Sequence, residues 1–370
     1  MKHRGLLFAA VCVCAALGIW LVSPATHAAA PGPAILQLTD DRASDVRPAW
    51  SPDNRTIAYQ SNREGPYHIY LMNADGTNQR ALTKGDSDDR HPVWMPDGKS
   101  ILFDSWDGQQ REIWSINVAN GNRTRVTRIG ALANFPAPSP DGQWMTFYVF
   151  KNEVLNLWKA RISGSDANPL TTELATADSN QCTFACHRAA WSQDSRAIAY
   201  SAGELDTIWM IAGEGAASQK VVADGEDNHF PWFLPDGRLG YVTEHIEPSS
   251  AWTDAWALDL KTGQRSLLQG RMSMQGPVEW SNDQTKILFH SPRAGNFDIY
   301  LIDLNALGGL NALQGTRVPV ERAPNTTPAA VPVTATPTFQ VENILILGLG
   351  IGFASMVAAG LIFWTLRRRG

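Results

Sequence analysis

The chain has 370 residues and a formal net charge of −5. Five of its basic residues stand close to the two ends of the chain. Without them the chain has 26 basic and 36 acidic residues, a net charge of −10. The acidic charge of the chain between its two ends argues against nucleic acid and against anionic lipid surfaces as partners.

The first 30 residues have the pattern of a secretory signal peptide. Lys2 and Arg4 precede an apolar stretch from Gly5 to Val22, and small residues follow up to Ala30. This order of a basic, an apolar and a small-residue region is typical of a segment that is cleaved after export. We expect residues 1–30 to direct the rest of the chain out of the cytoplasm.

Residues 34–305 repeat one pattern six times. It begins as "PAWSPDNRTIAY" at Pro48 and returns with changes, for example as "PVWMPDGKSILF" at Pro92. The aspartates of the six copies are Asp53, Asp97, Asp141, Asp194, Asp236 and Asp283. They are separated by 44, 44, 53, 42 and 47 residues. A period in the forties, filled with short apolar runs and turn residues, predicts the blades of a propeller.

These aspartates have a structural explanation. A proline presets φ at the first central turn position, an aspartate hydrogen-bonds to its own backbone, and Gly or Asn accepts a positive φ. A catalytic carboxylate is needed once or twice in a protein, whereas a turn is needed in every blade. We therefore expect the six aspartates to hold a hairpin between the first two strands of each blade.

A second hairpin follows in each repeat, as in "HIYLMNADGTNQRALT" from His68. An aromatic residue stands third in each of these runs: Tyr70, Trp114, Trp158, Trp209, Trp256 and Tyr300. Rings at one fixed place suit the space between radially arranged sheets. Four strands in each of six repeats predict an all-β fold, a six-bladed β-propeller of four-stranded antiparallel blades.

The last repeat lacks a recognisable fourth strand. The stretch "ALGGLNALQG" after Asn305 does not resemble the closing "RALT" or "NPLT" of other repeats, whereas "AILQLTDD", residues 34–41, does. An open ring would expose a strand edge. We predict that this N-terminal segment is the outer strand of the sixth blade and closes the ring.

Two cysteines, Cys182 and Cys186, lie in the longest interval between repeats, in "NQCTFACHRAAW". In an oxidising compartment this pair predicts a disulfide. Free thiols are one alternative. Covalent haem is another, although Cys-x-x-x-Cys-His is one residue longer than the usual attachment motif. We expect no cofactor and no metal.

The C-terminal part predicts a membrane tether. Residues 306–342 include a stretch rich in Pro, Thr and Ala, which predicts an extended stalk. Residues 343–366 predict a transmembrane helix, since Ile344 to Leu366 is 23 residues without a charge. The basic tail 367–370 places the C-terminus in the cytoplasm and the propeller outside it. Gly348 and Gly352 form a Gly-x-x-x-Gly, which permits a homodimer through this helix.

The repeat "PAWSPDNRTIAYQSNREGPYHIYLMNADGTNQRALT", residues 48–83, resembles the WD40-like PD40 repeat of TolB-type β-propellers. The resemblance covers about residues 34–305. It implies a periplasmic or extracellular scaffold that binds protein partners, with relatives that gate peptidases or act on oligosaccharides. We expect a membrane-anchored variant without the amino-terminal domain of TolB. The Gly-x-Ser-x-Gly motif of a hydrolase is absent from the sequence.

The residues just before the first strand of each repeat are candidates for a binding surface, because blade-linking loops meet the central channel there. These candidates are Arg47, Arg90, His91, Asn134, Phe135, His187, Arg188, His229 and Phe230. Arginine holds carboxylates, and neutral imidazole binds metals. Equivalent positions on a wide ring can be too far apart to share one ion, so we expect a binding surface rather than a metal site.

The sequence thus predicts a membrane-tethered, extracytoplasmic scaffold without enzymatic activity. Its partner would be an envelope protein, a secreted protein or a polymer. The alternative is a metal-dependent oligosaccharide lyase or lactonase that uses His91, His187 and His229. Ligating nitrogens within about 5 Å of one another would favour that alternative.

Overall fold

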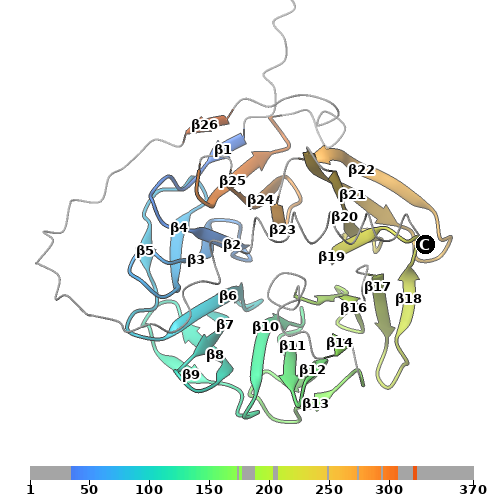
Figure 1. Ribbon diagram of the computed structural model, residues 1–370, viewed down its shortest axis with the longest axis horizontal. Helices are drawn as coiled ribbons and strands as arrows, with labels where there is room; N and C mark the ends of the chain where they lie inside the picture. The colour runs from blue at the N-terminus through green and yellow to red at the C-terminus, as the bar shows by residue number, and fades with distance from the viewer. Residues whose placement is uncertain are drawn as a thin grey trace, which may run out of the picture.

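The computed structural model of the protein describes residues 35–172, 175–176, 188–202, 207–247, 250–272, 275–292, 295–306 and 320–322. Within these residues the regular elements are strands, which form six sheets. The sheets stand around a central axis, and first strands such as β6 (Asp88–Trp94) and β10 (Leu132–Pro138) lie nearest to it (Figure 1). The predicted six-bladed β-propeller is confirmed.

The first three blades follow one another along the chain. Blade 1 consists of β2 (Asp45–Trp50), β3 (Thr56–Ser61), β4 (His68–Asn73) and β5 (Arg80–Ala81). Blade 2 consists of β6 (Asp88–Trp94), β7 (Ser100–Trp106), β8 (Arg111–Asn117) and β9 (Arg123–Arg125). Blade 3 consists of β10 (Leu132–Pro138), β11 (Trp144–Lys151), β12 (Val154–Arg161), β13 (Asn168–Pro169) and β14 (Ala175–Thr176). Both β13 and β14 pair with β12.

The remaining blades complete the ring. Blade 4 consists of β15 (Ala190–Trp191), β16 (Ala197–Ala202), β17 (Thr207–Ala212) and β18 (Gln219–Val222). Blade 5 consists of β19 (Asp227–Phe233), β20 (Leu239–Glu247), β21 (Ser250–Leu258) and β22 (Arg265–Met272). Blade 6 consists of β23 (Gln275–Trp280), β24 (Lys286–Ser291), β25 (Asp298–Asp303), β1 (Ile35–Gln37) and β26 (Val320–Arg322).

The N-terminal strand closes the ring as predicted. β1 pairs antiparallel with β25, and Leu36 lies opposite Leu301. Two residues beyond β1, the Oγ1 of Thr39 accepts a hydrogen bond of 3.0 Å from the backbone N–H of Ile299. Thr83 makes the same contact with Ile69 in blade 1. The segment therefore occupies the place of a fourth strand, and β26 adds a parallel strand to its outer edge.

The hydrophobic core is divided among the contacts between blades. Six clusters of buried residues each join side chains of two neighbouring blades. One cluster, for example, joins Ile69 of blade 1 to Ile101 and Phe103 of blade 2. The middle strands of a blade are covered on both faces for this reason. Their sequences are accordingly continuous apolar runs and do not alternate with polar residues.

The aromatic residue of each third strand lies against these clusters. Tyr70 and Tyr300 are buried, at 3% and 0% exposure. The tryptophans at this position are partly buried and pack against the clusters from the outside. Basic side chains of the outer strands cover two of them: the Cζ of Arg123 lies 4.5 Å from the ring centre of Trp114, and the Nζ of Lys220 lies 5.1 Å from that of Trp209.

The repeated aspartates lie in the hairpin turns between the first and second strands. In blade 1 the Oδ1 of Asp53 accepts hydrogen bonds from the Oγ of Ser51 at 2.6 Å and from the N–H of Arg55 at 3.1 Å. The other five aspartates likewise accept a backbone N–H bond from two residues further along: Asp97, Asp141, Asp194, Asp236 and Asp283. Their carboxylates are thereby committed to turns at the surface.

Several predicted features lie outside the described residues. They are the signal segment 1–30, the pair Cys182 and Cys186, most of the stalk, and the transmembrane segment with Gly348 and Gly352. Among the residues that are described, no helix has the length and apolarity that a membrane crossing requires.

Candidate functional site

The first strand of five blades is interrupted at the same place. In blades 1, 2, 3, 5 and 6 the pairing with the second strand shifts register there, for example between Val46 and Ala49 in blade 1. The residue inside the irregularity has a positive φ in four blades: 56° at Arg47, 53° at His91, 53° at Phe135 and 50° at Phe230. A β-bulge of this kind turns one side chain out of the regular pleat. Here it is repeated around the ring.

The bulged residues line a cavity of about 580 Å³ on the axis of the ring. Five blades each contribute one of the predicted candidates to it: Arg47, His91, Phe135, Arg188 and Phe230. The wall continues to the prolines of the hairpin turns, such as Pro52 and Pro96. We call this cavity the channel site.

The other predicted candidates do not line the channel site. Arg90 stacks over Tyr67 at 4.7 Å and pairs with Asp88. Asn134 is half-buried, and no hydrogen-bond partner of its Oδ1 is found among the described residues. His229 faces two carboxylates of its own blade, and His187 lies outside the described residues. In blades 1, 2, 3 and 5 the bulge thus places one of two adjacent residues in the channel site.

Side chains from three successive blades meet on one side of the channel site. The ring centres of His91 and Phe135 are 3.8 Å apart, and the Cζ of Arg47 lies 5.4 Å from the ring centre of Phe135. Burial lowers the pKa of Arg47 to about 10, so its guanidinium is charged at neutral pH. Among the residues that the structure describes, no carboxylate forms an ion pair with Arg47.

His91 and Asp104 form a buried pair behind this stack. The Nδ1 of His91 lies 2.7 Å from the Oδ1 of Asp104, whose Oδ2 accepts a hydrogen bond of 2.6 Å from the Nη1 of Arg111. Burial lowers the pKa of His91 to about 4, so the ring is neutral at pH 7. Burial opposes ionisation of Asp104, but His91 and Arg111 outweigh it and hold its pKa at about 2.

Arg188 of blade 4 pairs with Glu279 of blade 6, and both residues line the channel site. Burial raises the pKa of Glu279, and the two arginines Arg188 and Arg47 oppose that shift. His290 is buried nearby, and burial lowers its pKa to about 3. Asp104 is paired with Arg111 and Glu279 with Arg188, and both histidines are neutral at pH 7. Asp104 and Glu279 also attract the charge of Arg47, but neither forms an ion pair with it among the described residues.

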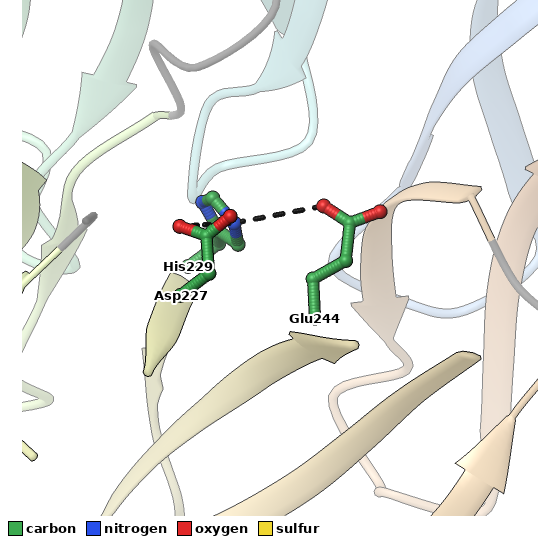
Figure 2. A group of neighbouring side chains, drawn as sticks. All are labelled: Asp227, His229 and Glu244. Atoms are coloured by element: carbon green, nitrogen blue, oxygen red, sulfur yellow. Dashed lines mark ion pairs between the residues drawn. The ribbon is translucent and has the colours of Figure 1, made fainter. Parts of the chain in front are cut away.

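A second group of polar side chains lies in blade 5. Asp227 and His229 project from β19 and Glu244 from β20 (Figure 2). The Nε2 of His229 lies 3.1 Å from the Oδ1 of Asp227 and 3.7 Å from the Oε2 of Glu244. One ligand atom from each residue lies within 4.8 Å of the other two. We call these three residues the blade 5 triad.

Sequence reasoning found part of these sites. Glu279 was not among the candidates, although it stands where Ala49, Val93 and Ala137 stand in other repeats, and a charge at an apolar position is a usable signal. Asp104 and Glu244 lie on second strands, whereas the predicted candidates belong to the beginnings of the repeats. The missed residues came from pairing between strands, which the repeat pattern alone does not give.

The chain is similar to TolB proteins and to propeller enzymes. The PD40 family, described as the TolB beta propeller domain, matches residues 32–189. The structure of TolB from Acinetobacter baumannii matches with a TM-score of 0.52 and 18% identity, over 70% of this chain and 63% of that chain. The chain thus spans less than two thirds of the length of that protein.

Two further structures are similar. A putative TolB from Agrobacterium tumefaciens matches with a TM-score of 0.54 and 16% identity, over 73% of this chain and 96% of that chain. An oligogalacturonate lyase in complex with manganese matches with a TM-score of 0.55 and 15% identity, over 74% of this chain and 94% of that chain. Similarity at these identities shows the shared fold alone.

Proposed function

Because the chain carries a TolB-type β-propeller, we propose that it is a binding scaffold of the cell envelope without enzymatic activity. In this proposal, a protein partner places an acidic side chain or a C-terminal carboxylate in the channel site. The propeller stands outside the cytoplasm and is tethered to the cell membrane by the C-terminal segment.

The charge of Arg47, which has no ion-pair partner among the described residues, carries the proposal. A half-buried guanidinium without a hydrogen-bonded carboxylate costs stability, since a desolvated charge is favourable only when it is closely paired. A carboxylate brought by a partner would supply that pair, with the planar geometry that arginine binds best. The rings of Phe135 and Phe230 provide apolar contacts beside it. The ligand class is therefore an extended segment with one anionic group and neighbouring apolar groups.

The sequence supports the tether and its orientation. The signal pattern of residues 1–30 and the three arginines after Leu366 both assign the propeller to the outside of the membrane. Protease added to cells with a permeabilised outer surface should therefore degrade the propeller of the intact chain. A propeller that becomes accessible only after the membrane is dissolved would contradict this orientation.

Site-specific photo-crosslinking tests the binding function in cells. A photoreactive phenylalanine analogue at Phe230 of the full-length chain should capture a discrete partner, because this ring lines the channel site. The same analogue at Leu260, which is 37% exposed, serves as the control. Adding Arg47→Gln should reduce capture at Phe230 about tenfold or more, since a charge-assisted hydrogen bond contributes roughly 1.5–3 kcal/mol.

Four results would overturn the proposal. Capture could be absent at Phe230, equal at Leu260, or unchanged by Arg47→Gln. The purified chain could also convert oligosaccharides or lactones, which would contradict the absence of enzymatic activity. Thermal unfolding of the Arg47→Gln variant must show an intact fold, so that lost capture reports on the channel site.

A further inference from the structure

We propose that the blade 5 triad of Asp227, His229 and Glu244 binds a divalent transition-metal ion. The proposal concerns a site separate from the channel charge at Arg47 and does not depend on the binding function above. Its basis is the placement of one imidazole and two carboxylates on the hydrogen-bonded strands β19 and β20.

Strand geometry brings the three side chains to one face of blade 5. Asp227 and His229 are two residues apart on β19, so their side chains leave the strand on the same side. Glu244 lies directly opposite Asp227 in the β19–β20 register, and directly opposed residues also share a face. The register therefore fixes the donors in place before any ion arrives.

The distances suit a shared ion. Ligands about 2.1 Å from a metal are separated from one another by roughly 3–4 Å in tetrahedral or octahedral geometry. The His229 Nε2 lies 3.1 Å from Asp227 Oδ1 and 3.7 Å from Glu244 Oε2, within this spacing. All three donor atoms lie within 4.8 Å of one another. An ion between them needs only small side-chain movements.

Burial and charge favour a cation at this point. The His229 side chain is 9% exposed, whereas those of Asp227 and Glu244 are 36% and 33% exposed. The imidazole is thus held inside the blade, and the carboxylates keep access to solvent, from which an ion can enter. A metal takes imidazole in its neutral form, and the two carboxylates then supply a charge of −2 that a divalent cation neutralises.

The donor set selects the class of ion. Calcium and magnesium are held by oxygen ligands, whereas imidazole suits zinc and other first-row transition metals, and carboxylates suit manganese. We therefore expect Zn²⁺ or Mn²⁺. Three protein ligands leave at least one coordination position for water or for a group of a bound molecule. Because the rings of His229 and Phe230 are 5.8 Å apart, the ion would sit next to the wall of the channel site.

Titration calorimetry tests the proposal with the metals alone. The full-length chain, without a histidine tag, is treated with a chelator in detergent, dialysed, and titrated with zinc chloride or manganese chloride. We expect one ion per chain. Glu244→Gln should weaken binding about tenfold or more, and His229→Gln about 100-fold, because each removes one of three ligands.

The same blade offers a matched control. The Nε2 of His245 lies 3.1 Å from the Oδ2 of Asp254, so His245→Gln removes another imidazole beside a carboxylate. It should leave the affinity and the number of bound ions unchanged. Cys182→Ser with Cys186→Ser is a second control, since thiolates also bind zinc.

The titrations distinguish a metal site at the blade 5 triad from a site at the cysteines and from no site at all. Absence of saturable binding of both metals, or equal binding by the wild type and His229→Gln, would overturn the proposal. Loss of binding in the cysteine variant but not in His229→Gln would assign the ion to the cysteines. Thermal unfolding of each variant without metal checks the fold, and the Mn²⁺ electron paramagnetic resonance signal should show nitrogen coupling that His229→Gln abolishes.

Discussion

The Oε1 of Gln60, on the second strand of blade 1, accepts a hydrogen bond of 2.8 Å from the backbone N–H of His91 in the bulge of blade 2. The next blade repeats this contact, because the Oδ1 of Asp104 accepts a bond of 3.1 Å from the N–H of Phe135. A bulge leaves one backbone N–H without a partner in its own sheet. At both bulges the preceding blade supplies the missing acceptor, so the channel site is held by contacts between blades.

Gln60→Leu should therefore destabilise the propeller. Gln60 is 3% exposed, and its loss leaves the His91 N–H buried without an acceptor, at a cost of about 1–3 kcal/mol. The measurement is urea unfolding followed by tryptophan fluorescence. Ser201→Ala is the matched control, because Ser201 occupies the equivalent position in blade 4 and its Oγ has no hydrogen-bond partner among the described residues. Equal losses in the two variants would contradict the role of Gln60.

Arg47→Asn should stabilise the protein while it removes the binding charge. Asparagine tolerates the φ of 56° better than arginine, and the substitution removes a half-buried guanidinium from the channel site. We expect a net gain of about 1 kcal/mol in the free energy of unfolding, which already includes the lost contact between Arg47 and Phe135. The exposed Arg55→Asn should change stability by no more than about 0.5 kcal/mol. A destabilised Arg47→Asn would show that the arginine has a structural role.

Asp298 should make stability fall as pH rises. It is 1% exposed and is held by Gln37 and Thr39 of the closing segment. Burial raises its pKa to about 7, and the nearby Asp45 adds to the shift. A raised carboxyl pKa means that its contribution is full below the unfolded value near 4 and is lost as pH rises through 7, at about 1.4 kcal/mol per unit of difference.

Asp298→Asn should remove that slope between pH 4 and pH 7. The buried His91 and His290 have lowered pKa values, so they produce a slope of the opposite sign, with stability lost below pH 6.5. For this reason the test compares unfolding free energies of the variant and the wild type at each pH. Asp303→Asn, at the other end of β25, is the control and should keep the wild-type profile. If the unfolding free energies of Asp298→Asn and the wild type differ by the same amount at every pH from 4 to 7, the raised pKa is contradicted.

Gly240→Ala should be costly because Trp232 fills the space above it. A Cβ at Gly240 would lie 2.1 Å from the Trp232 ring, which stacks on Trp280 with ring centres 5.7 Å apart. Such overpacking costs about 1–3 kcal/mol. In blade 1 the corresponding facing pair is Ala49 and Ala58. Trp232→Ala should therefore abolish the extra cost of Gly240→Ala, as a double-mutant cycle would measure. Additive losses would contradict the steric explanation.

The fold was predictable because its sequence repeat occurs six times along the chain. Each copy carries its own turn residues and apolar runs, and the one missing fourth strand had a visible substitute at residues 34–41, which β1 confirms. The candidate residues were expected just before the first strands, whereas in blades 1, 2, 3 and 5 they lie at a bulge inside those strands. The sequence does not give this bulge, and nothing in the pair Arg90 and His91 says which side chain enters the channel.

The sequence by itself determined the number of blades, their order, the turns and the closure of the ring, because these depend on local patterns that recur. The tertiary structure decided which charges meet. Gln60 and His91 are 31 residues apart, Arg188 and Glu279 are 91 apart, and the Asp227–Glu244 pairing depends on the register of two strands. Such pairs arise when the ring closes and blades pack face to face, and a repeat pattern read along the chain contains no information about them.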